Sequence, residues 1–285
     1  MRARLLTGAA LIGGLVVGIA SLPRLATKKL KPPLLPVAAT PDDLDLPHEQ
    51  IWLRSPTGTR VHAWFIPSQQ TGPAVVVMHG WTANSGWMLP MAGPLRTAGF
   101  HVLFIDGRGH GFSEPDEFTG ALQFSEDIEA GLDWLRSDPR VTTLGVLGHS
   151  AGGSAAILAA SRRRYVGAVV AAAAVADPRL IRWGWLPQGT QEAFMRYVSR
   201  RTGYRTEEMI PTERIPLIRA PILLIHGEAD DMVPVRHSRL LGEAALDAEL
   251  LILPEGDHSS IDKFAPAGPR VVEFFRQHLM AGEAG

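Results

Sequence analysis

Residues 148–152 read Gly-His-Ser-Ala-Gly, the most informative motif in the sequence. It follows an apolar run at residues 144–147 that predicts a strand, and it leads into an alanine-rich run at 151–160 that predicts a helix. A sharp turn from strand to helix pushes Ser150 out above the edge of a sheet, and small residues two positions away on each side let the backbones approach closely. A glycine-rich turn that merely begins a helix is the alternative. The flanking strand and helix favour a nucleophilic serine.

Strand-like and helix-like segments alternate around this turn. Strand patterns occur at residues 74–78 (AVVVM), 101–105 (HVLFI), 166–175, 221–225 (PILLI) and 249–253, and helical patterns occur at 88–98, 124–135 and 271–279. Residues 50–53 and 60–66 flank Ser-Pro-Thr-Gly and predict a hairpin before the first of these strands. Such alternation predicts an α/β fold with a mostly parallel, doubly wound sheet covered by helices on both faces.

One region interrupts the alternation and is expected to form a small cap over the site. This cap insertion spans about residues 178–218 within a domain predicted at 48–285, which follows a proline-rich linker at 25–47. Its apolar side chains are predicted either to line an acyl pocket or to form the core of the cap itself: Trp183, Trp185, Leu186, Phe194, Met195 and Tyr197.

Composition narrows the classes of function. The chain has 285 residues, enough for one large α/β domain, and its formal net charge of −1 gives no indication of a nucleic-acid partner. The absence of cysteine excludes disulfides, thiolate metal sites and a cysteine nucleophile. Nothing in the sequence predicts the oligomeric state.

The N-terminal segment, residues 1–24, has the composition of a membrane helix. Residues 5–22 are eighteen consecutive uncharged residues, with arginines before them and basic residues after them. A helix of that length spans about 27 Å, close to the thickness of a bilayer core. A single-pass anchor that holds the protein at a membrane is therefore expected. The alternative is a signal peptide that is cleaved before secretion.

A serine hydroxyl needs a base, and His258 is the best placed of ten histidines. It lies just past the final predicted strand, and loops at that edge of an α/β sheet gather functional groups. Asp230, in the loop after the strand at 221–225, is predicted to orient the imidazole, with Asp231 as second choice. Asp257 adjoins His258 in sequence and is therefore a poor partner. The order Ser, Asp, His along the chain suits this fold.

Acyl transfer also needs two main-chain N–H donors for the oxyanion. One is expected from Ala151, directly after Ser150. The other is expected from Trp81, because His79-Gly80-Trp81-Thr82 follows the strand at residues 74–78. An ordinary turn is the alternative for this second loop.

Taken in order, these motifs make the chain resemble the α/β-hydrolase superfamily, and within it the Bem46-like and lysophospholipase-like serine hydrolases. The resemblance covers about residues 48–280 and includes Asp106-Gly107-Arg108-Gly109-His110-Gly111-Phe112-Ser113. In such families this stretch is a structural loop, so the resemblance implies no catalytic role for His110. It also implies that the acid is Asp230, although Asp231 stands where many relatives have proline.

The predicted function is hydrolysis of a carboxylic ester through an acyl-enzyme on Ser150, with a lipid-like small-molecule ester as the expected substrate. No metal or organic cofactor is expected. Thioesterase, amidase or peptidase activity on the same residues is an alternative, and so is a non-catalytic binding protein on this fold.

Overall fold

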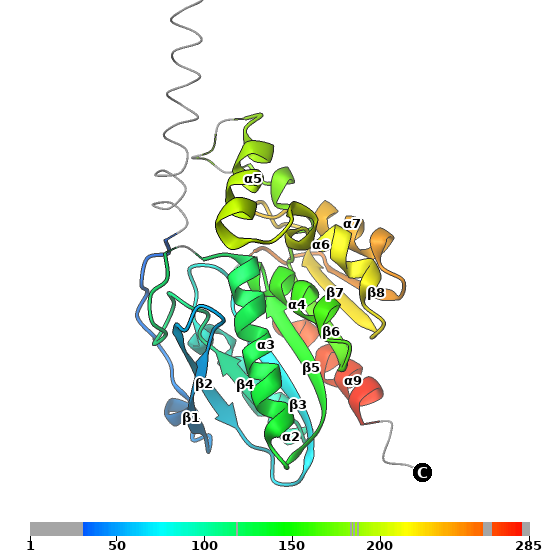
Figure 1. Ribbon diagram of the computed structural model, residues 1–285. Coiled ribbons are helices and arrows are strands. Elements are labelled where there is room, and N and C mark those ends of the chain that lie inside the picture. The colour runs from blue at the N-terminus through cyan, green and yellow to red at the C-terminus, as the bar shows by residue number, and fades with distance from the viewer. Residues whose placement is uncertain are drawn as a thin grey trace, which may run out of the picture.

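The fold is built on one eight-stranded sheet, seen in a computed structural model that describes residues 31–117, 119–182, 184, 186, 188–258 and 264–280. The strands are β1 (Glu49–Arg54), β2 (Arg60–Ile66), β3 (Gly72–Met78), β4 (His101–Ile105), β5 (Val141–His149), β6 (Val166–Ala172), β7 (Ile222–Gly227) and β8 (Ala248–Leu253). Their order in the sheet is β1-β2-β4-β3-β5-β6-β7-β8. β2 runs antiparallel to β1 and β4, and all other neighbouring pairs are parallel (Figure 1).

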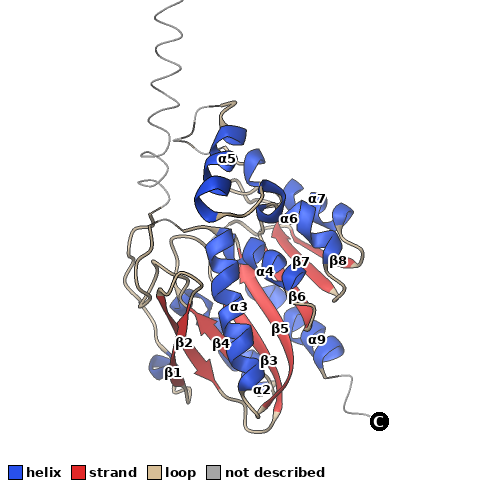
Figure 2. Cartoon of the chain, in the orientation of Figure 1, coloured by secondary structure: helices blue, strands red, loops and turns tan. Residues whose placement is uncertain are grey.

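Helices cover both faces of this sheet (Figure 2). The α-helices are α2 (Ala92–Thr97), α3 (Ala121–Ser137), α4 (Ala151–Arg162), α5 (Gln191–Thr202), α6 (Pro211–Arg214), α7 (Arg236–Ala244) and α9 (Gly268–Leu279). Short 3-10 helices are η1 (Pro41–Leu44), η2 (Ser85–Met91), η3 (Pro178–Leu180), η4 (Thr206–Met209), η5 (Ile215–Leu217) and η6 (Ala265–Ala267). The predicted doubly wound α/β architecture is therefore confirmed.

Two apolar cores explain why the sheet is covered twice. On one face, α3, α4 and α7 pack Ile128, Ile157 and Leu241 against the strands. On the other face, η2, α2 and α9 contribute side chains such as Leu95 and Phe274. Strand side chains alternate between the faces, so each central strand supplies residues to both cores. This double burial is why the central strands read as unbroken apolar runs in the sequence.

Several elements begin or end a few residues away from their predicted bounds, and two of these differences have a clear physical cause. The helix predicted at residues 88–98 begins instead as the 3-10 helix η2 and becomes α-helical only at α2, because Pro90 lies inside it and has no N–H to donate. The strand predicted at residues 166–175 ends at Ala172, because Ala173 adopts a left-handed conformation with φ 49° and turns the chain.

The segment between β6 and β7, residues 173–221, contains η3, α5, η4, α6 and η5 and is called the β6–β7 insertion below. Its helix α5 lies beyond the carboxyl ends of β5 and β7 (Figure 1). It has a small apolar core of its own, which includes Leu186, Met195 and Ile210.

The predicted membrane segment, residues 1–24, lies outside the described residues. Within the residues that are described, no helix has both the length and the apolar character needed to cross a bilayer. Residues 32–40 run without helix or strand ahead of η1, and Pro32 is buried near Gly109.

Candidate active site

Ser150 stands on a strained turn between β5 and α4. Its backbone has φ 55° and ψ −118°, a combination that non-glycine residues rarely adopt, and its N–H donates to the carbonyl of Ala172 at 2.8 Å. The predicted small residues are needed on both sides. A Cβ on Gly148 would lie 2.1 Å from the carbonyl oxygen of Gly152, and a Cβ on Gly152 would lie 2.4 Å from that of His79. Only glycine at both positions allows this turn.

The three side chains predicted from sequence lie in contact. His258 Nε2 is 2.9 Å from Ser150 Oγ, and His258 Nδ1 is 2.7 Å from Asp230 Oδ2. An ionised carboxylate only accepts, so His258 Nδ1 carries the proton and Nε2 is left to accept from the serine hydroxyl. The three residues come from the loops after β5, β7 and β8, which end at the same edge of the sheet. Asp231, the second choice for the acid, is exposed to solvent.

Asp230 is held by donors on both of its oxygens. Oδ1 accepts from the main-chain N–H groups of Met232 (3.0 Å) and Val233 (2.7 Å), while Oδ2 accepts from His258 and lies 3.3 Å from His226 Nε2. Burial on its own raises the pKa of Asp230, but the hydrogen bonds from His226, His258 and Val233 outweigh it and hold this pKa well below its usual range. The carboxylate therefore stays ionised and can stabilise a positive charge on His258.

His226 is a positioning residue that the sequence reasoning missed. Its Nε2–H donates to the carbonyl of Val233 at 2.7 Å, and its Nδ1 lies 2.6 Å from Ser238 Oγ on α7. The ring is fully buried and fixes the turn that carries Asp230. The His-Gly pair at the end of β7 was the available signal, because a buried histidine at a strand end needs partners for both nitrogens.

The two residues predicted to supply the oxyanion donors both lie next to Ser150. Ala151 is the first residue of α4, and the loop of Trp81 approaches so closely that a Cβ on Gly80 would lie 3.2 Å from Ser150 Cβ. His79 fixes this loop, because its ring bonds to the carbonyl of Gly80 at 2.7 Å. Among the described residues, neither the Trp81 nor the Ala151 main-chain N–H has an acceptor. Both donors are thus available to a substrate oxygen.

Residues 106–113 pack against the loop that follows β3 and hold it in place through hydrogen bonds. Asp106 is fully buried and accepts from the N–H of Ser85 at 2.8 Å and from His62 Nδ1 at 2.9 Å. His110 Nε2 accepts from the N–H of Thr82 at 3.2 Å. Burial lowers the pKa of His110 to about 4, so the ring is neutral and has a lone pair for that bond. These contacts fit the structural role that the resemblance implied.

His149 is a second residue whose role the sequence did not reveal. Its Nε2 lies 2.9 Å from the carbonyl oxygen of His258. A carbonyl only accepts, so Nε2 carries the proton, and burial lowers the pKa of His149 to about 4, with the nearby His258 acting in the same direction. The neutral ring therefore ties the loop that carries His258 to the turn that carries Ser150. Phe264 packs edge-on against the same ring, with centroids 5.6 Å apart.

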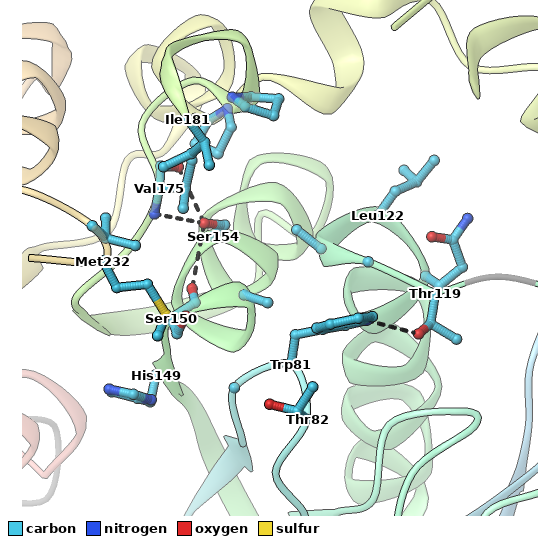
Figure 3. Close-up of a pocket in the computed structure, with 18 of the residues that line it drawn as sticks. Trp81, Thr82, Thr119, Leu122, His149, Ser150, Ser154, Val175, Ile181 and Met232 are labelled. Atoms are coloured by element: carbon cyan, nitrogen blue, oxygen red, sulfur yellow. Dashed lines mark hydrogen bonds between the residues drawn. The ribbon is translucent and has the colours of Figure 1, made fainter. Parts of the chain in front are cut away.

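A cavity of about 690 Å³ opens beside Ser150 and His258. Figure 3 shows Trp81, Leu122, Val175, Ile181 and Met232 around it, with Ser150 and His149 at its base. Its walls come from the loop after β3, the start of α3, the start of α4 and the β6–β7 insertion.

The apolar side chains predicted for the cap divide between the two roles considered. Phe194 and Met195 of α5 do both, because they line the cavity and also pack in the apolar core of the insertion. Leu186 and Tyr197 belong to that core only. Trp183 and Trp185 lie outside the described residues. Among the described residues, no cluster of three or more histidine, cysteine or carboxylate side chains has the arrangement of a metal site.

Comparison with known proteins gives a consistent family. The sequence profile of the family described as "Serine aminopeptidase, S33" matches residues 69–204. The protein YfhR of Escherichia coli K12, named as uncharacterized, is 30% identical over 228 residues, which cover 76% of this chain and 75% of YfhR. The "Alpha/beta hydrolase domain-containing protein WAV2" of Arabidopsis thaliana is 29% identical over 250 residues, which cover 80% of this chain and 79% of WAV2.

Solved structures show the same fold. The Pyrococcus furiosus esterase Pf2001 superposes with a TM-score of 0.70 at 22% identity, over 87% of this chain and 97% of the esterase. Est1E from Butyrivibrio proteoclasticus, solved with ferulic acid bound, superposes with a TM-score of 0.66 at 19% identity, over 80% of this chain and 98% of Est1E. At these identities the likeness concerns the fold alone.

Proposed function

This chain belongs to the α/β-hydrolase superfamily, and on that premise we propose that it is a serine hydrolase that cleaves carboxylic esters through an acyl-enzyme on Ser150. The observation that carries the proposal is the position of His258. Its Nε2 lies 2.9 Å from Ser150 Oγ while its Nδ1 lies 2.7 Å from the carboxylate of Asp230. This arrangement lets one imidazole take a proton on one side while its developing charge is stabilised on the other.

Acylation follows from these contacts. His258 Nε2 takes the Ser150 proton as Oγ attacks the ester carbonyl, and the electron pair of the C=O bond moves to the oxygen. The N–H groups of Trp81 and Ala151 stabilise that oxyanion, helped by the positive end of the α4 dipole. His258 then gives its proton to the departing alkoxide as the C–O bond breaks, which leaves the acyl group on Ser150.

Deacylation uses the same residues with water in place of the serine. His258, neutral again, takes a proton from water while the water oxygen attacks the acyl carbonyl. The second tetrahedral intermediate collapses when His258 returns that proton to Ser150 Oγ. Asp230 stays ionised throughout, because its hydrogen bonds keep its pKa well below the usual range.

The cavity favours an ester with an apolar acyl group. Leu122, Phe194, Met195, Val198 and Met209 are all buried or nearly buried and line its walls. Burying apolar area in such a pocket contributes about 25 cal/mol per Å² to substrate binding. Medium-chain and lipid-like esters fit this lining better than short polar ones. Membership of the lysophospholipase-like or Bem46-like hydrolases within the superfamily stays a prediction, and the apolar lining of the cavity is consistent with it.

Peptide hydrolysis is the competing activity, because the matched family profile is named for a serine aminopeptidase. An aminopeptidase must hold the ammonium group of a peptide N-terminus close to the nucleophile, and a carboxylate is the usual partner for such a charge. Among the described residues that line the cavity, none is aspartate or glutamate. We therefore favour ester over aminopeptidase substrates. Thioesters carry no such charge and are tested beside esters.

The test is a panel of p-nitrophenyl esters of increasing acyl length, with the matching thioesters and an alanine p-nitroanilide. We expect turnover of esters that rises with chain length, and labelling of the protein by a fluorophosphonate probe. Ser150→Ala should abolish both. Ser161→Ala is the matched control, because this serine lies on the same helix but does not line the cavity; its hydroxyl donates to the carbonyl of Leu158 and accepts from Arg214 Nε. Unchanged ester turnover in Ser150→Ala would reject the mechanism, and an unlabelled wild type would favour a non-catalytic binding protein.

We also propose that residues 1–24 anchor the protein in a membrane, on the strength of the eighteen uncharged residues at 5–22. The full chain should then sediment with membranes and resist extraction by alkaline carbonate. A soluble secreted protein whose N-terminus begins after residue 20 would instead establish the signal-peptide alternative.

A further inference from the structure

We propose that the substrate carries an anionic group, a phosphate or a carboxylate, on the alcohol side of its ester, and that Arg182 at the rim of the cavity binds it. The inference rests on the proposed ester hydrolysis at Ser150 and goes beyond it by naming the class of alcohol. Three observations support it: the charges that line the cavity, the lack of a partner for Arg182, and the charge of the β6–β7 insertion.

Arg182 differs in charge from every other described residue around the cavity. Apart from the histidines His149 and His258, it is the one ionisable side chain among the described lining residues. It is exposed, as a residue at a cavity mouth should be, while Phe194 and Met195 of the same insertion are buried deeper in the wall. A substrate that extends from the apolar interior to the rim therefore meets an isolated positive charge at its outer end.

Arg182 has no carboxylate partner among the residues that the structure describes. Within the described ranges of the chain it forms no ion pair, whereas Arg179, three residues earlier, is bound by Asp177 at 2.6 Å and by Glu192 at 2.9 Å. The guanidinium of Arg182 thus keeps its donors for a ligand. Its planar fork matches the paired oxygens of a carboxylate or phosphate, and hydrogen bonds between charged groups are stronger than neutral ones.

The charge of the whole insertion points the same way. Residues 173–221 contain eight arginines and five acidic residues, whereas the rest of residues 42–285 contains 14 basic and 24 acidic residues. A positive insertion on an acidic body concentrates anions at the insertion and disfavours them elsewhere, and salt weakens this attraction. A cationic substrate, such as a peptide with a free amino terminus, would be repelled from the same mouth.

The proposal also assigns an orientation to the substrate. With the ester carbonyl at Ser150 and the acyl chain along the apolar walls, the alcohol portion is the part that reaches Arg182. An amphiphile with this order of groups is either an acyl ester of a phosphorylated alcohol, as in a lysolipid headgroup, or an acyl ester of a hydroxy acid. Phosphate and carboxylate share the chemistry that Arg182 recognises, and the experiment separates them.

The experiment compares three octanoyl esters, those of glycerol, glycerate and glycerol 3-phosphate, with the full-length wild-type protein and its variants in detergent at low salt. We expect the wild type to prefer at least one anionic ester over the glycerol ester by about tenfold in kcat/KM. Arg182→Gln should lower kcat/KM for that ester about tenfold, mainly through KM, and leave the glycerol ester within twofold. Arg182→Lys should recover part of the loss, and 0.5 M NaCl should shrink it.

Arg196→Gln is the matched control, because Arg196 is an exposed arginine of α5 in the same insertion and does not line the cavity. Equal effects of Arg182→Gln and Arg196→Gln would overturn the inference, as would a wild type that hydrolyses the glycerol ester best. If the wild type hydrolyses none of the three and Ser150 is not labelled by fluorophosphonate, the proposed function itself fails. Preference for glycerol 3-phosphate over glycerate, or the reverse, decides between the two anions.

Discussion

Replacing Asp230 by asparagine tests the site most directly, because the structure dictates how the amide must sit. The Oδ1 position accepts from two main-chain donors, Met232 N–H and Val233 N–H, at 3.0 and 2.7 Å. The new amide satisfies both donors only if its oxygen takes that position. Its NH2 group then faces His258 Nδ1, which must accept instead of donate. The imidazole proton moves to Nε2, and His258 can no longer take the proton of Ser150.

The size of the effect follows from the cost of turning the amide over. The flipped amide would restore the productive form of His258 but would leave the buried N–H of Val233 and the partly buried N–H of Met232 unpaired, at about 1–3 kcal/mol each. That places the productive form about 2–6 kcal/mol above the unproductive one, and each 1.4 kcal/mol is about a factor of ten in rate. We expect kcat to fall by about 30-fold to 10⁴-fold, with KM changed by less than about threefold because the cavity is untouched.

The assay is steady-state hydrolysis of the preferred p-nitrophenyl ester, with thermal unfolding to confirm that Asp230→Asn is folded. Asp231→Asn is the matched control, because that neighbouring side chain is exposed, and its kcat should stay within twofold of wild type. A loss of less than tenfold in Asp230→Asn would refute the reasoning about the imidazole proton. A large loss in Asp231→Asn with a small one in Asp230→Asn would show that Asp231 is the acid.

Three further predictions address the support of the site. His149→Phe keeps an aromatic ring but removes the donor to the His258 carbonyl, so kcat should fall about tenfold while KM stays within twofold. His149→Gln should recover most of the lost kcat. Equal losses of kcat in the two variants would contradict a positioning role for His149. Gly152→Ala should lower the free energy of unfolding by about 3 kcal/mol in urea titrations, because its Cβ would meet main-chain oxygens at 2.4 and 2.5 Å, whereas Gly93→Ala has open space and should not destabilise. The free energy of unfolding should also fall as pH drops from 6.5 to about 4. The unfolded chain protonates His110 and His149 near pH 6.5, whereas burial holds the pKa of both residues at about 4 in the folded state. A flat stability profile between these pH values, or an unchanged slope in His149→Gln, would count against this prediction.

The order of the elements and the candidate residues of the site follow from the amino-acid sequence. Short apolar runs rich in branched residues, such as residues 74–78, indicate strands buried on both faces, and the glycines at 148 and 152 favour a sharp turn that exposes Ser150. Ser150, Asp230 and His258 were found from their places after predicted strands, because the carboxyl ends of parallel strands meet at one edge of a sheet.

The side chains that support Ser150, Asp230 and His258 became visible only from the packing of the elements in three dimensions. His149 contacts the carbonyl of His258, and His226 contacts Ser238 Oγ and the carbonyl of Val233. The fold brings these partners together, and no local sequence pattern encodes such contacts. The same holds for the cavity, because its lining joins the starts of α3 and α4 to the β6–β7 insertion. Periodicity records which face of an element is buried, whereas a binding site depends on how separate elements pack against one another.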